Sequence, residues 1–187
     1  MICSKLAVLK LINLEEIMSK IGLFYGSDGG NTQRIAEKIA VNLREKHSKE
    51  VEVFDVAKAS REDLKGFSNL ILATPTYGSG ELQNDWEEFL TTLSPLDFEG
   101  KVVAFVGLGD QDTYGDTFCD GVFEIYNRVS KNAKIIGKTS IEGYEYQESN
   151  SVIEGEFVGL ILDENNQEDL TDTRIENWCD LIAGQFN

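Results

Sequence analysis

The sequence is poor in the residues that build disulfide frameworks and metal centres. Its 187 residues include three cysteines, Cys3, Cys119 and Cys179, and one histidine, His47. The cysteines are odd in number and widely spaced, with no CxxC pair, which argues against a disulfide scaffold, a zinc site or an iron–sulfur centre. Apolar residues surround Cys119 and Cys179. We therefore expect reduced, partly buried thiols, no metal and a cytoplasmic protein.

Basic residues are also scarce. There are 17 lysines and arginines against 33 aspartates and glutamates, which gives a formal net charge of −16. A field of this sign repels nucleic acid phosphates and anionic membrane surfaces, and it attracts the basic faces of other proteins. We therefore expect cationic protein partners and neither a nucleic-acid nor a membrane partner. The alternative is that the acidity serves only solubility.

The start of the chain lacks a long apolar run. Between residues 1 and 17 the apolar stretches are interrupted by Lys10 and followed by Glu15 and Glu16, so neither a membrane span nor a secretory signal is predicted. Met18 directly precedes the first clear strand. We interpret 1–18 as an upstream extension wrongly assigned to the protein, and 19–187 as a single domain. A short amphipathic helix that packs on the domain is the alternative.

Strand-like and helix-like segments alternate from residue 21 onward, which predicts a parallel sheet with helices on both faces. The expected helices are 32–46, 83–93, 117–130 and 172–185. The expected strands are 21–25, 51–56, 70–73, 101–106 and a fifth in two pieces, 133–137 and 157–162. The polar insertion between those pieces, 138–156, should be a surface excursion with its own pairing. Ligands of such sheets bind beyond the carboxyl ends of the strands, so the loops after strands one, three and four form the candidate site.

The loop after the first strand, residues 27–32, reads SDGGNT and precedes a helix whose amino end favours an anion. Its adjacent glycines allow a concave backbone, and the hydroxyls of Ser27 and Thr32 can donate to phosphate oxygens. The loop has no lysine or arginine and matches neither the Gly-x-x-x-x-Gly-Lys nor the Gly-x-Gly-x-x-Gly pattern. The alternative is a capped helix start with Asn31 or Thr32 as the N-cap.

Taken together, the three loops resemble those of the flavodoxin family, in its long-chain bacterial group. The family's phosphate loop reads Ser/Thr-x-Thr-Gly-x-Thr, and this chain departs from it at Gly29, where a threonine is usual. The loop at 74–82, TPTYGSGEL, resembles the family loop that covers one flavin face, with Tyr77 where tryptophan is frequent. The loop at 107–116, GLGDQDTYGD, resembles the other flavin loop, of form Gly-x-Gly-Asp-x-x-x-Tyr, and contains Tyr114. The interrupted fifth strand resembles that of the long-chain group.

The resemblance implies a flavodoxin-like α/β fold, a doubly wound five-stranded parallel sheet of order 2-1-3-4-5, with one FMN held noncovalently between Tyr77 and Tyr114. The peptide between Gly78 and Ser79 would turn toward the flavin on reduction, which glycine tolerates. No catalytic acid or base is implied. The residues implied at the cofactor are Ser27, Asp28, Gly29, Gly30, Asn31, Thr32, Thr74, Pro75, Thr76, Tyr77, Gly78, Ser79, Gly107, Leu108, Gly109, Asp110, Tyr114 and Thr117.

The function implied is that of a monomeric, low-potential, one-electron carrier that replaces ferredoxin, and not of an enzyme. Its partners would be the basic faces of redox enzymes such as pyruvate oxidoreductase or flavodoxin/ferredoxin reductase. An FMN-dependent NAD(P)H quinone or nitro reductase is the alternative, but it would need further segments for nicotinamide and a dimer interface. A receiver-type signalling domain is a remote alternative, because receivers need an aspartate where the third strand ends in Ala73-Thr74-Pro75.

Overall fold

In the computed structural model, which describes residues 20–187, strands and helices alternate along the chain as the sequence predicts. The extension expected at 1–18 therefore lies outside the described residues. The strands are β1 (Ile21–Tyr25), β2 (Val51–Asp55), β3 (Asn69–Tyr77), β4 (Glu81–Leu82), β5 (Val102–Leu108), β6 (Lys134–Ile136), β7 (Thr139–Ser140), β8 (Val152–Ile153), β9 (Glu156–Phe157) and β10 (Leu160–Leu162). The helices are α2 (Asn31–His47), α3 (Arg61–Lys65), α4 (Asn84–Thr92), α5 (Asp120–Val129), α6 (Glu168–Ala183) and the short 3-10 helix η1 (Pro95–Phe98).

The main sheet follows the order β10-β5-β3-β1-β2, and these neighbours are parallel. β6 also pairs in parallel with β5, opposite residues 102–104, whereas β10 pairs opposite residues 106–108. The two short strands therefore occupy one position in the sheet, one after the other. This arrangement confirms the predicted order 2-1-3-4-5 with an interrupted fifth strand.

The insertion forms a small antiparallel sheet of order β7-β9-β8, which agrees with the prediction that it pairs within itself. The predicted second piece of the fifth strand, 157–162, is wrong at its start, because Phe157 belongs to this small sheet. Gly159 marks the change of sheet. A Cβ there would lie 2.2 Å from the carbonyl oxygen of Phe105, so the chain enters its place beside β5 at a point that admits no side chain.

The helices differ from prediction mainly at their starts. α5 begins at Asp120 and not near residue 117, because Cys119 adopts a left-handed φ of 58° and keeps the preceding residues in the loop. α6 begins at Glu168, ahead of the predicted start at residue 172. Its first turn is acidic, which favours a helix start, but it shows no apolar periodicity, so the sequence pattern did not reveal it. α3 and η1 are too short to show a period. None of the helices in residues 20–187 has the length and apolar character that a membrane crossing needs.

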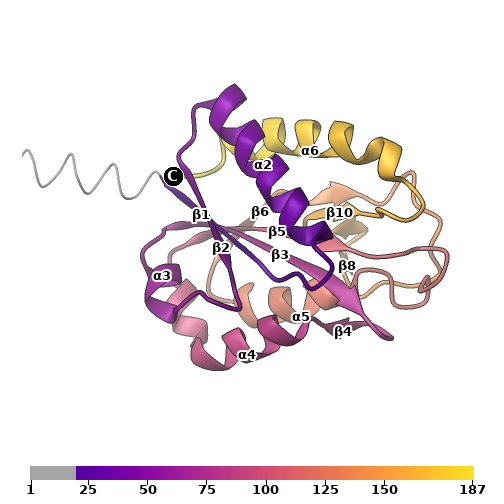
Figure 1. Ribbon diagram of the computed structural model, residues 1–187, viewed down its shortest axis with the longest axis horizontal. Helices are drawn as coiled ribbons and strands as arrows, with labels where there is room; N and C mark the ends of the chain where they lie inside the picture. Colours follow the sequence, from indigo (N-terminus) through magenta and orange to yellow (C-terminus); the bar gives the residue numbers. More distant parts are fainter. Residues whose placement is uncertain (1–19) are drawn as a thin grey trace, which may run out of the picture.

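Helices cover both faces of the sheet, with α2 and α6 on one face and α3, α4 and α5 on the other (Figure 1). Side chains alternate between the two cores: Leu23 faces the core under α2 and α6, and Phe24 faces the other. Cys119 and Cys179 are unpaired and fully buried, and burial raises the pKa of Cys179 to about 12. Both described thiols are therefore part of the packing, as expected.

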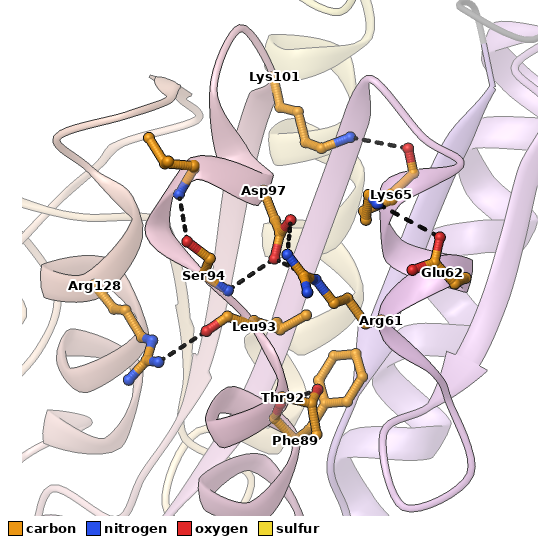
Figure 2. A network of polar contacts seen from close by, with 11 residues as sticks. Arg61, Glu62, Lys65, Phe89, Thr92, Leu93, Ser94, Asp97, Lys101 and Arg128 are labelled. Carbon is orange, nitrogen blue, oxygen red and sulfur yellow. Dashed lines mark hydrogen bonds and ion pairs between the residues drawn. The ribbon is translucent and has the colours of Figure 1, made fainter.

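A polar network joins α3 to η1 beside the amino ends of β3 and β5 (Figure 2). Arg61 donates from Nε and Nη2 to the two carboxylate oxygens of Asp97, each over 2.9 Å. Asp97 also accepts from the backbone N–H of Ser94 over 2.7 Å, and its side chain is 6% exposed. The hydrogen bond with Arg61 holds the pKa of Asp97 below its usual range. This network ties α3 to η1 at the end of the sheet opposite the candidate site.

Replacing Asp97 by alanine should lower the free energy of unfolding by about 1–3 kcal/mol, because it leaves donors of Arg61 and Ser94 without their acceptor. Urea denaturation measures the change. The matched control is Glu62→Ala, since the Glu62 carboxylate pairs with Lys65 over 3.5 Å at the surface and is 77% exposed. Equal losses in the two variants would contradict this role for Asp97.

Candidate functional site

A cavity of about 220 Å³ opens at the edge of the sheet where β3, β5 and β10 end. Ten predicted site residues line it, so the structure brings together residues that follow strands one, three and four. These ten are Asn31, Pro75, Thr76, Tyr77, Gly78, Leu108, Gly109, Asp110, Tyr114 and Thr117. Four further lining residues were not predicted, namely Phe118, Cys119, Glu164 and Asn165.

The other predicted residues lie near the cavity without lining it. Thr74 is fully buried and donates to the carbonyl of Pro75 over 2.9 Å, and Gly107 lies within β5. Ser79 lines a separate groove between β4, α4 and α5. The remaining five belong to the first loop and its junction with α2, next to Asn31: Ser27, Asp28, Gly29, Gly30 and Thr32.

The first loop ends in a helix whose amino end has no side-chain cap. Gly30 is the N-cap, with φ 87°, and Asn31 and Thr32 already belong to α2, so the alternative of a side-chain-capped start is wrong. Ser27 Oγ accepts from the N–H of Gly30 over 3.0 Å and closes the turn. The first N–H groups of α2 are therefore without a capping side chain, as in helix ends that bind anions.

The second loop is a tight hairpin between β3 and β4, in which Tyr77 pairs with Glu81. Its turn contains Gly78 and Gly80, with φ of 49° and 101°. A Cβ on Gly80 would lie 3.2 Å from Cβ atoms of both Thr117 and Asp120, so the turn packs closely on the loop before α5. Both positions need glycine for the backbone conformation, and Gly80 needs it for space as well.

Two tyrosines supply aromatic surface to the cavity. The Tyr77 hydroxyl accepts a hydrogen bond from the backbone N–H of Asp28 over 3.3 Å and so connects the second loop to the first. Burial raises the pKa of Tyr77 above its usual value. Tyr114, from the third loop, is 46% exposed. The two rings thus reach the cavity from the end of β3 and from the third loop, with the surface that a planar aromatic ligand could contact.

Thr117 is the clearest sign of a polar ligand. Its Oγ1 is buried and finds no hydrogen-bond partner among the residues that the structure describes, although Thr117 lines the cavity. A buried hydroxyl without a partner is costly, and a ligand in the cavity could satisfy it. The uncapped end of α2, the aromatic rings and this hydroxyl together suit a planar, phosphorylated molecule.

The third loop is fixed by Asp110. This carboxylate accepts hydrogen bonds from the backbone N–H groups of Asp112 and Thr113, over 3.1 and 2.9 Å, and from the side-chain amides of Asn165 and Asn166. Burial alone would raise the pKa of Asp110, but these hydrogen bonds outweigh it and lower the pKa to about 2. A negative charge therefore sits at the wall of the cavity.

The residues that sequence reasoning missed come from two places. Phe118 and Cys119 lie just beyond the third loop, in a stretch expected to be helical. Glu164 and Asn165 follow β10. The rule that ligands bind beyond the carboxyl ends of parallel strands applies equally to the fifth strand. Applied there, it would have pointed to residues 163–167.

Comparison with known proteins shows which family the chain is similar to. Residues 23–178 match the family described as Flavodoxin. The chain is 50% identical over 169 residues to a flavodoxin of Helicobacter pylori, an alignment that covers 90% of this chain and 99% of that protein. It is 41% identical over 169 residues to a flavodoxin of Nostoc, with 89% of this chain and 97% of the relative covered.

Solved structures agree with the sequence relatives. The flavodoxin of Fusobacterium nucleatum, in a crystal structure bound to flavin mononucleotide, superposes with a TM-score of 0.85 at 39% identity, over 91% of this chain and 100% of that one. Oxidised flavodoxin 2 of Bacillus cereus gives a TM-score of 0.67 at 27% identity, over 89% of this chain and 99% of that one. The interrupted fifth strand and the length of 187 residues agree with the long-chain group.

The two glycines of the first loop should respond differently to alanine. Gly30→Ala should lower the free energy of unfolding by about 1–2 kcal/mol, because a Cβ is strained at its left-handed φ of 87° even though the space beside it is open. Gly29 has open space and no such φ, so Gly29→Ala should leave stability unchanged or slightly raised. Urea denaturation of both variants tests this, and an equal loss in the two would contradict the assigned geometry.

Proposed function

The chain belongs to the flavodoxin family, and from that premise we propose that it carries single electrons between larger redox enzymes on a noncovalently bound FMN. The observation that carries the proposal is the combination of an uncapped helix end with a cavity lined by Tyr77 and Tyr114. The first element suits a phosphate and the second a flavin ring. The protein is thus an electron-transfer protein and not an enzyme.

The residues of the three loops fit FMN in distinct roles. The first loop and the amino end of α2 would hold the phosphate through backbone N–H groups and the hydroxyls of Ser27 and Thr32. Tyr77 and Tyr114 would contact the ring, and the free hydroxyl of Thr117 would bond a polar group of the cofactor. FMN, when bound, supplies the redox chemistry, and the chain supplies position and electrostatics.

The charge around the cavity supports a low potential. Asp110 is ionised at the wall of the cavity, and no lysine or arginine lines the cavity described for residues 20–187. A negative carboxylate disfavours the arrival of further negative charge nearby. The chain as a whole, at −16, acts in the same direction. We therefore propose a carrier that works at low potential, in place of ferredoxin.

The same charges support basic partners. Glu81, Glu87 and Glu124 line the groove beside the hairpin turn and outnumber its one basic side chain, Arg128, so the groove is acidic where a partner would approach the flavin. Opposite charge on a partner speeds association and orients it. We propose a cytoplasmic monomer that meets the basic faces of enzymes such as pyruvate oxidoreductase or flavodoxin/ferredoxin reductase.

The first experiment is to purify the protein, record its visible spectrum and titrate it with dithionite without oxygen. The expected result is FMN-like absorption bands, a long-wavelength band at half reduction and no oxidation of NAD(P)H by the protein alone. A colourless protein that fails to take up added FMN would overturn the proposal. Direct turnover of NAD(P)H with a quinone would instead indicate a reductase.

Restoring the family's threonine should tighten phosphate binding. Gly29→Thr should bind FMN about three- to tenfold more tightly, since the added hydroxyl contributes one hydrogen bond of about 1 kcal/mol. No atom lies within 4 Å of a Cβ built at Gly29, so the side chain has room. Fluorescence quenching measures the affinity. Gly29→Val is the matched control without a hydroxyl, and riboflavin is the matched ligand without a phosphate. Tightening in either control would contradict a phosphate contact.

A further inference from the structure

The turn after β10 is tied to the third loop through side-chain amides. Asn166 Nδ2 lies 2.9 Å from Asp110 Oδ1 and 2.9 Å from Asp163 Oδ2, so one amide group donates to two carboxylates. Asn165 Nδ2 donates to the other oxygen of Asp110 over 2.8 Å. We call this group of four residues, Asp110, Asp163, Asn165 and Asn166, the asparagine clamp.

Asp163 anchors the clamp from inside the protein. Its side chain is fully buried, and it pairs with no lysine or arginine in the part of the chain that the structure describes. It accepts instead from the backbone N–H groups of Gln111, Asn165 and Asn166, over 3.0 to 3.1 Å. A buried carboxylate held only by neutral donors depends on every one of them.

We propose that the asparagine clamp is a positioning device for the flavin, in which Asn166 joins the carboxylates of Asp110 and Asp163 and so fixes the third loop as a wall of the cavity. The inference rests on the proposed function, because it assigns these residues a role toward FMN. Asp110 and Asn165 line the cavity, whereas Asp163 and Asn166 act from behind it. Leu108, Gly109 and Tyr114 belong to the same wall.

The physical reason lies in the charge of the two carboxylates. Without a donor between them, Asp110 and Asp163 would repel each other. The third loop would then be held at this edge mainly through the N–H groups of Gly109 and Gln111, which bond to the carbonyl of Leu162 and to Asp163. The backbone N–H of Tyr114 bonds to the carbonyl of Asp110 over 2.9 Å, so displacement of Asp110 also displaces a ring that lines the cavity. The low pKa of Asp110 agrees with the clamp, since both amides stabilise its ionised form.

The sharpest variant is Asn166→Asp, which keeps the shape of the side chain but replaces the donor by a third carboxylate. It should weaken FMN binding about tenfold or more, since it removes two charged hydrogen bonds and adds repulsion. Asn177→Asp is the control, because it adds the same charge at an exposed position on α6. Its FMN affinity should stay within about twofold of the wild type. Equal affinities in the two variants would overturn the inference.

A second readout does not depend on FMN. In the apoprotein, a carboxyl NMR titration should show the pKa of Asp110 rise from about 2 toward the ordinary range in Asn165→Ala, which removes only one donor at the cavity surface. This variant serves if Asn166→Asp does not fold. An unchanged Asp110 pKa would overturn the inference. If the wild type itself binds no FMN, the proposed function fails, whereas the titration still decides whether the clamp exists.

Discussion

Parallel strands that end at one edge of the sheet are the constraint on which the site depends. β5 is the central example: it pairs with β3 over residues 102–108 on one side, and with β6 and then β10 on the other. Its carboxyl end is thereby held between two strand ends, and the loops that follow all three strands meet there. The cavity exists because of this shared edge, and the residues that line it would not meet otherwise.

At that edge, neutral hydrogen-bond donors hold the carboxylates of Asp110 and Asp163, in place of a lysine or arginine. Asp110 and Asp163 are bonded by backbone N–H groups and asparagine amides, and Arg34, from the first turns of α2, pairs instead with Glu164. Neutral donors leave the negative charge of a carboxylate in place, whereas an ion pair would cancel it. The edge therefore stays negative, which suits both a low-potential flavin and a basic partner.

The sequence allowed the central strands and the three loops to be predicted, because buried parallel strands are apolar throughout and their loops carry Gly-rich patterns. It failed where tertiary contacts decide the local conformation. The change of sheet at Gly159 depends on close approach to the carbonyl of Phe105, and the later start of α5 depends on the left-handed Cys119. Asn165 and Asn166 belong to no recognisable motif. Their role depends on their hydrogen bonds to Asp110, which lies more than fifty residues earlier in the chain.

The insertion in the fifth strand belongs to the support of the cavity. Asn150 donates from its backbone and side-chain nitrogens to Asp120, over 2.7 and 2.6 Å, and the hydroxyl of Ser151 donates to the carbonyl of Cys119 over 2.6 Å. Asp120 in turn packs beneath Gly80 of the hairpin turn. Cys119 can hold its strained φ because the insertion fixes its carbonyl. The cavity-lining Cys119 and the turn expected to move on reduction are thus both supported by the insertion, so changes in the insertion reach the flavin site through Cys119 and Asp120.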